Sequence, residues 1–207
     1  MAAAAKPVIT AKTGRSPQAP PSPALSSPPE LEQCPDVLFA VGVSLLFKES
    51  FSEAAAIFKK LLQQQPDHAR ALLCMGQILL VSGRIDDALD YCNRALTLDY
   101  LLPSGYYLRG LIYEMHEMEQ ESFSEYRKAI LLEMDFVMPH YQLGKLCFRC
   151  GDHKSGLREL KNSLKLLEKS GRESVVPFSR GLSREVFIGQ LRDEIQRVET
   201  VMAREAA

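Results

Sequence analysis

Four glycines recur along the chain at a constant interval of 34 residues, and this interval is the strongest constraint on the fold. They are Gly42, Gly76, Gly110 and Gly144. Twelve residues after each glycine stands a second small residue, in a series made of Ala54, Ala88, Ser122 and Gly156. Two series of small residues with one period are typical of a repeat architecture. They predict four copies of one unit, in which two helices approach each other closely at fixed points.

The repeated unit resembles the tetratricopeptide repeat, a helix–turn–helix that stacks into a solenoid. The third copy has the best aromatic match to the family pattern, with Tyr106, Tyr113 and Tyr126 at characteristic positions. The predicted fold is therefore an all-α solenoid of four repeats. Their predicted ranges are 35–68, 69–102, 103–136 and 137–170.

The segments on either side of the repeats have a different composition. Residues 1–33 are rich in Ala, Pro and Ser and have few large apolar side chains, which predicts a disordered tail or linker. Residues 171–182 break the period and predict a second linker. Residues 183–204 predict an amphipathic C-terminal helix. It either caps the solenoid beyond repeat four or folds back into its groove, and the cap is the simpler arrangement. Its apolar stripe is made of Phe187, Leu191, Ile195, Val198 and Met202.

The overall charge and hydropathy limit the possible partners. A net charge of −1 argues against nucleic acid, because phosphate binding needs a clustered basic surface. The longest apolar run, Val37 to Phe47, is too short to cross a bilayer, so no membrane insertion is expected. No secretory signal is visible at the N-terminus, and the five cysteines are odd in number. Free thiols in a reducing compartment, and hence a cytoplasmic location, are predicted.

The sequence lacks the common catalytic motifs. Neither a glycine-rich phosphate loop nor a G-x-S-x-G elbow is present, which predicts a protein that is not an enzyme and needs no cofactor. His140 is expected to be a packed ring. Cys147 and Cys150 form a C-x-x-C near a helix end, where the helix dipole raises thiol pKa values. Zinc would need two more ligands, so no metal site is predicted, and a thiol sensor stays open as an alternative.

The resemblance to tetratricopeptide repeats also predicts a binding groove. In that family the fifth, ninth and twelfth residues of each repeat lie on its first helix and line the concave face. Here they are mostly apolar or aromatic and lack the Lys and Asn with which some family members clamp acidic chaperone peptides. An amphipathic helix of a protein partner is the expected ligand. The predicted groove residues are Phe39, Val43, Leu73, Gln77, Tyr107, Leu111, Tyr141, Lys145 and Phe148, beside Leu46, Leu80 and Glu114 at the other twelfth positions.

The first helix is apolar on nearly every side, although a terminal repeat should have a polar outer face. The N-terminal tail, a second copy of the chain or a partner domain could cover it. We predict a homodimer or partner docking through this helix.

A narrower resemblance covers Tyr106 to Leu191. The runs Y-Y-L-R-G-L-I-Y-E, Y-R-K-A-I-L-L and H-Y-Q-L-G-K-L, followed by Val176-Pro177 and Gly181-Leu182-Ser183, resemble the repeat modules attached to bacterial chemotaxis receptor methyltransferases. The catalytic domain of that family has no counterpart here, so its methyl-transfer activity cannot be assigned to any position. The resemblance implies a scaffold or adaptor in a bacterial chemosensory or signalling complex, with a methyltransferase or chemoreceptor component as partner. The alternative is a detached regulatory module of a separate methyltransferase.

Overall fold

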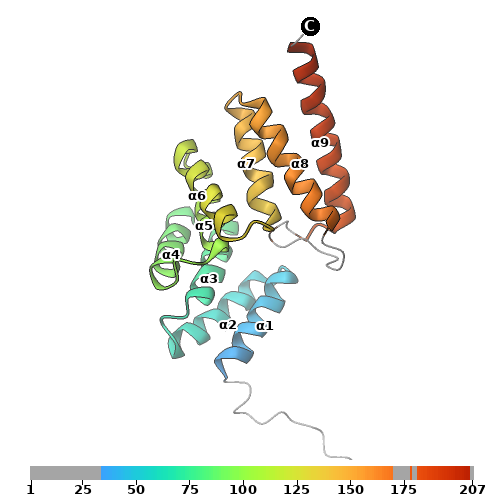
Figure 1. Ribbon diagram of the computed structural model, residues 1–207. Helices are drawn as coiled ribbons and strands as arrows, with labels where there is room; N and C mark the ends of the chain where they lie inside the picture. Colours follow the sequence, from blue (N-terminus) through green and yellow to red (C-terminus); the bar gives the residue numbers. More distant parts are fainter. Residues whose placement is uncertain (1–33, 170–177, 179–180, 206–207) are drawn as a thin grey trace, which may run out of the picture.

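Nine α-helices make up the part of the chain that the computed structural model describes, which is residues 34–169, 178 and 181–205 (Figure 1). The predicted tail at 1–33 and most of the predicted linker lie outside these residues. No strand is found in the described ranges, so the all-α prediction is confirmed. The helices are α1 (Pro35–Phe47), α2 (Phe51–Gln64), α3 (Ala69–Val81), α4 (Ile85–Leu98), α5 (Pro103–Met115), α6 (Glu119–Leu132), α7 (Val137–Arg149), α8 (His153–Lys169) and α9 (Arg184–Glu205).

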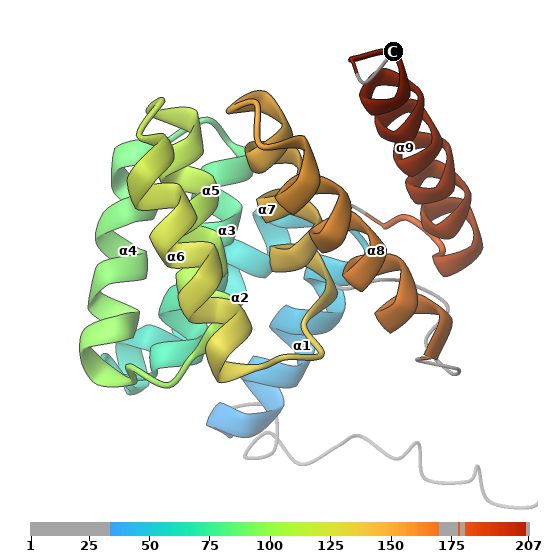
Figure 2. The same ribbon diagram turned by 45° about the horizontal axis from the view of Figure 1, so that its top comes forward.

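The helices form successive antiparallel pairs, and each predicted 34-residue frame contains one pair. Each helix packs mainly on its neighbours in the chain, with the closest packing inside the pairs. Figures 1 and 2 show the pairs stacked from α1–α2 at one end to α7–α8 at the other, with α9 beyond them. None of the described helices is both long and apolar enough to cross a membrane.

The two series of small residues meet inside the pairs. The hydroxyl of Ser122 donates a hydrogen bond of 2.9 Å to the carbonyl oxygen of Gly110. A Cβ atom on Gly76 would lie 3.3 Å from the carbonyl oxygen of Ala88, and one on Gly156 would lie 2.9 Å from that of Gly144. The backbones of the two helices are therefore nearly in contact at these points, and this closeness explains the 34-residue spacing.

The turns between the two helices of each repeat share one backbone conformation. Gly83 and Gly151 have φ values of 77° and 79°, in the left-handed region that glycine adopts without steric cost. Glu49 and Glu117 occupy the equivalent places with φ values of 58° and 60°. Helix packing thus imposes the same turn even where the sequence has no glycine.

The Glu117→Gly variant is expected to raise the free energy of unfolding by about 0.5–1 kcal/mol, because it removes a left-handed conformation that costs a non-glycine residue about 1–2 kcal/mol. Thermal unfolding measures the change. The control is Lys60→Gly in the middle of α2, which should lower stability by about 1 kcal/mol. Equal losses in both variants would contradict strain at Glu117.

A buried polar pair joins α7 to α8. His140 Nδ1 lies 2.8 Å from Glu159 Oε2, and its Nε2 lies 3.2 Å from the carbonyl oxygen of Met134. The two ring nitrogens thus each lie within hydrogen-bond distance of an oxygen atom. The His140 bond lowers the pKa of Glu159, and Asn162 and Arg158 add smaller effects in the same direction. The expectation of a packed ring at His140 is confirmed, and the ring is also hydrogen-bonded to a buried carboxyl group.

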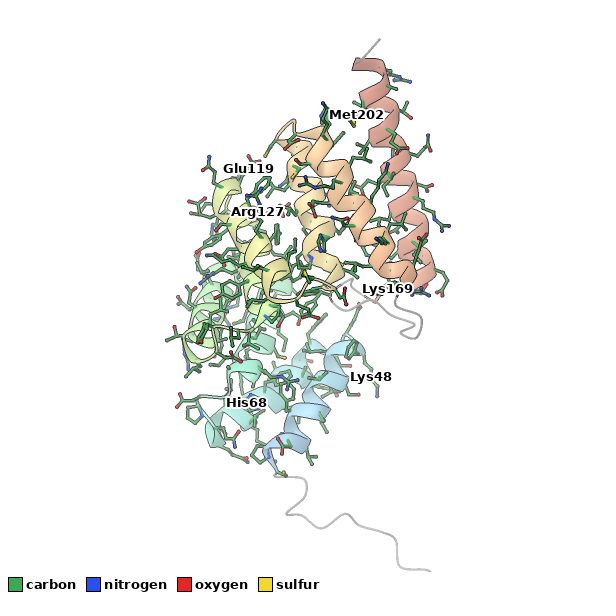
Figure 3. The ribbon with its side chains drawn as sticks, viewed as in Figure 1. Lys48, His68, Glu119, Arg127, Lys169 and Met202 are labelled. Carbon is green, nitrogen blue, oxygen red and sulfur yellow. The ribbon has the colours of Figure 1, made fainter. Side chains whose placement is uncertain are left out.

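Helix α9 packs on α8 through the predicted apolar stripe. Phe187, Leu191, Ile195 and Val198 are buried, and Met202, labelled in Figure 3, is partly buried. The Arg184 guanidinium donates hydrogen bonds to the carbonyl oxygens of Leu167 and Glu168 at the end of α8. The opposite side of α9 is exposed and largely polar, which is the cap arrangement. At the other end of the stack, α1 exposes the apolar side chains of Val37, Val41 and Phe47.

Candidate protein-binding face

The residues at the fifth positions are covered by neighbouring elements. Tyr107 of α5 is 1% exposed, and its ring lies between those of Tyr126, Phe136 and Phe178, with centroids 6.0, 5.3 and 5.4 Å away. Leu73 of α3 is also buried. These two side chains therefore offer almost no surface to a ligand in this structure.

Phe39 and Tyr141 are covered less completely. The Phe39 ring stacks on His68 at 5.1 Å, and the Arg70 guanidinium carbon lies 4.6 Å from its centroid. The Tyr141 ring meets Phe187 of α9 edge-on at 5.0 Å. Both fifth-position rings thus take part in packing between successive elements, while keeping part of their surface accessible.

Helix α9 also affects the ionisation of the Tyr141 hydroxyl. Burial raises the pKa of its hydroxyl to about 12, and a hydrogen bond to the Glu194 carboxylate acts in the same direction. The Lys145 ammonium lies 5.3 Å from the centroid of the Tyr141 ring. The surroundings of Tyr141 in repeat four therefore include side chains of α9, which lies outside the repeats.

The ninth and twelfth positions are partly exposed in all four repeats and give a row of residues on the first helices. We call this row the inner face, and every one of its residues is neither buried nor fully exposed. It comes from α1, α3, α5 and α7, the first helix of each pair. Its members are Val43, Leu46, Gln77, Leu80, Leu111, Glu114, Lys145 and Phe148.

The inner face is apolar at one end and charged at the other. Repeats one and two contribute three aliphatic side chains and the amide of Gln77. In repeat three, the Glu114 carboxylate accepts a hydrogen bond of 2.8 Å from the Tyr126 hydroxyl and pairs with Arg149 at 2.8 Å. Burial, followed by the Glu114 charge, raises the pKa of Tyr126 well above its usual value. Glu114 is therefore already paired inside the chain, so the apolar side chains dominate what this face can offer.

Phe178 contacts this region, although the sequence interpretation placed it only in a linker. Its ring lies 5.4 Å from Tyr107 and 5.7 Å from Phe136, between centroids. Nearby in the chain, a Cβ atom on Gly181 would lie 3.4 Å from Glu49 Oε1 in the α1–α2 turn. In the sequence, Phe178 is an aromatic residue in a segment without periodicity, and such a pattern does not predict which residues it contacts.

The C-x-x-C lies at the end of α7, as predicted. Cys147 is buried in the core, and burial raises the pKa of its thiol to about 11. Cys150 is exposed, but partial desolvation and a contact of 3.4 Å with the Glu119 carboxylate also raise the pKa of its thiol. Both environments disfavour the reactive thiolate. Across the described residues, no group of three or more His, Cys, Asp or Glu side chains is arranged to hold a metal ion.

A further exposed apolar surface was missed by the sequence interpretation. It lies where α4 leads into α5 and α6 into α7, and Leu131, Met134 and Tyr100 are its most exposed members. Its repeat spacing was visible in the sequence, since Leu98 and Leu132, like Tyr100 and Met134, are 34 residues apart. The surface consists of Leu98, Tyr100, Leu101, Leu131, Leu132 and Met134.

Comparison with known proteins agrees with this architecture. A family profile described as Tetratricopeptide repeat matches residues 40–100. The tetratricopeptide-repeat protein TTC0263 of Thermus thermophilus superposes with a TM-score of 0.64 over 83% of this chain and 84% of its own, at 16% identity. The chain has the tetratricopeptide-repeat fold. Comparison with curated proteins finds no match.

Two other solved structures have a similar solenoid. MamA of Desulfovibrio magneticus RS-1 has a TM-score of 0.56 and 24% identity, covering 68% of this chain and 80% of its own. A chain of the APC/C hetero-tetramer Cut9–Hcn1 has a TM-score of 0.67 and 17% identity, covering 81% of this chain and 32% of its own. Likeness at these identities shows the tetratricopeptide-repeat fold alone. That fold supports a role in protein–protein interaction.

Proposed function

We propose that this chain is a non-catalytic scaffold that binds a segment of a partner protein along the inner face. The observation that carries the proposal is the partial exposure of the ninth and twelfth residues on the first helix of every repeat, α1, α3, α5 and α7. A row of this kind suits a segment that lies across several repeats and contacts each of them.

The side chains of the inner face favour an amphipathic partner. Val43, Leu46 and Leu80 present aliphatic surface at the first two repeats, and Leu111 continues it into the third. An amphipathic helix places apolar residues three and four positions apart along one side, and it buries them in an apolar groove. Burial of apolar area, at about 25 cal/mol per Å², then supplies the main driving force.

A bacterial chemosensory or signalling complex is the setting that we propose for this scaffold. The support comes from the sequence runs of repeats three and four and from Gly181-Leu182-Ser183, which resemble repeat modules of receptor methyltransferases. A receptor methyltransferase or a chemoreceptor component is the proposed partner, and a cytoplasmic location follows from it. A regulatory module that changes the rate of a separate methyltransferase is the second form of the same proposal.

The test places charges at two partly exposed positions of the inner face whose side chains also pack on the edge of the core, so circular dichroism must first show that the variant folds. The double variant Val43→Lys with Leu111→Lys is expected to weaken binding to purified receptor methyltransferase of the same cell at least tenfold, because two apolar contacts are replaced by desolvated charges. Isothermal titration measures the affinity, and receptor methylation with and without the chain measures regulation. Replacing the fifth-position tyrosines would be a poorer test, since Tyr107 is buried and its loss would disturb folding.

The matched control is Leu131→Lys, a highly exposed side chain at the end of α6 that is not part of the inner face. It should bind like the wild type. Equal weakening by the control and the double variant would contradict the inner face as the binding surface. If the wild type binds the methyltransferase but the methylation rate stays unchanged, the chain acts as a scaffold and does not regulate the enzyme.

A further inference from the structure

Phe178 occupies an aromatic site beside the inner face. The site is made by Tyr107 of α5 and by Phe136, which directly precedes α7, and both are at least nine-tenths buried. The Phe178 ring meets Tyr107 edge-on, with an interplanar angle of 63°, and it is tilted by 50° against Phe136. Edge-on and tilted pairs at these distances are the favoured aromatic arrangements. The site therefore has the shape and the electrostatic character that suit one aromatic side chain.

The backbone of Phe178 is less well suited to its place. Its φ of 64° lies in the left-handed region, which bulky residues rarely adopt. The side chain is only partly buried, in contrast to the two rings beneath it. Its ring contacts Tyr107 and Phe136, so an aromatic side chain on a backbone with negative φ would make the same contacts with less strain.

Helix α9 has contacts of its own with α8. The Arg184 hydrogen bonds to α8 and the buried stripe beginning at Phe187 attach α9 independently. Gly181 lies against the α1–α2 turn at Glu49, so the described residues of this segment approach repeat one as well as repeat three. Phe178 can thus leave its site while the cap stays on the solenoid.

We propose that Phe178 is an internal occupant of a binding subsite, and that a partner segment binds by placing an aromatic side chain of its own between Tyr107 and Phe136. This rests on the proposed function, because it adds an anchor subsite and a competing internal side chain to the same face. The subsite favours a partner segment that carries a Phe or Tyr beside its aliphatic residues. Partner binding and release of Phe178 are then coupled, and the apparent affinity of the wild type is lowered by the fraction of molecules whose subsite is filled.

The sequence of the chain supplies a probe for the test. A fluorescein-labelled peptide with the sequence of residues 174–183, SVVPFSRGLS, is titrated into the full-length wild type and the full-length Phe178→Ala variant. Fluorescence anisotropy is expected to show at least tenfold tighter binding to the variant, whose subsite is empty. The same peptide carrying Phe178→Ala should bind the variant at least tenfold more weakly than the unchanged peptide.

A matched control is Phe123→Ala, which removes a partly buried ring from α6 and should leave the peptide affinity at the wild-type value. If Phe178→Ala fails to fold by circular dichroism, Phe178→Leu keeps apolar volume in the site and should give an intermediate gain in affinity. Equal peptide affinity for wild type and variant, or binding that ignores the peptide's phenylalanine, would overturn the proposal. A methyltransferase that still binds through Val43 and Leu111 would then show that the inner face functions without this subsite.

Discussion

The His140→Ala variant is expected to lose about 2–4 kcal/mol of unfolding free energy, because it leaves the Glu159 carboxylate buried without its main partner. His140 and Glu159 are 8% exposed, and the bond between them is 2.8 Å long. The exposed partner Arg158, at 3.2 Å, compensates only in part. Urea unfolding followed by circular dichroism measures the loss.

Two comparisons separate the buried pair from ordinary surface charges. Asp87→Ala breaks the exposed ion pair with Arg84 and should cost less than about 1 kcal/mol. The double variant His140→Leu with Glu159→Leu replaces both polar side chains by apolar groups, and it should be more stable than His140→Ala. A double variant less stable than the single one would contradict this account.

The pH dependence of stability follows from the same pair. The folded pKa of Glu159 lies below its ordinary value of 4.5, so its ionised form stabilises the folded state. That contribution is present above the ordinary pKa and is lost as the pH falls through the lower, folded pKa. The wild type should therefore lose more stability between pH 7 and pH 3 than Glu159→Gln does.

The Gly110→Ala variant is expected to lose about 1–3 kcal/mol through overpacking. A Cβ atom at this position would lie 2.6 Å from Cε1 of Tyr126, which is fully buried. The Tyr126 ring cannot swing aside, because its hydroxyl is bonded to Glu114 and its other side meets Tyr107. Urea unfolding again measures the change.

The stability changes of alanine variants at two other glycines serve as comparisons for Gly110→Ala. At Gly76 the nearest atoms to an added Cβ lie at 3.3 Å, so Gly76→Ala should cost much less than Gly110→Ala. At Gly189 in α9 nothing lies within 4 Å, and Gly189→Ala should gain up to about 1 kcal/mol of helix propensity. A different ranking of the three variants would show that helix contact does not explain the glycine series.

The solenoid was predictable because the small residues record contacts between helices directly. Each glycine marks where a first helix touches its second helix, so the 34-residue spacing predicts the pairs and their order. Gly83 and Gly151 likewise marked their turns, whereas Glu49 and Glu117 adopt the same conformation without a local signal. There the packed helices on both sides determine the backbone, and a sequence pattern cannot record that.

The binding face was predictable only in part. The register predicts which side of a first helix a residue lies on, but the next element decides whether that side stays open. Tyr107 has the position of a groove residue and is nevertheless covered, by Phe136 and Phe178. Phe178 is 71 residues further along the chain and outside the period, so nothing in the local pattern indicates its contact. The nine groove residues stay a prediction that the charge variants test.

The closeness of Gly181 to Glu49 has a consequence for cooperativity. In a row of repeats, each unit senses only its neighbours, and unfolding can begin at one end without affecting the other. Here a residue that follows the last repeat lies against the first turn of the first repeat. The two ends are thereby linked by a path that does not pass through the intervening units. We therefore expect fraying at one end to loosen the other, so that the chain unfolds more nearly as one unit than an open array of equal length.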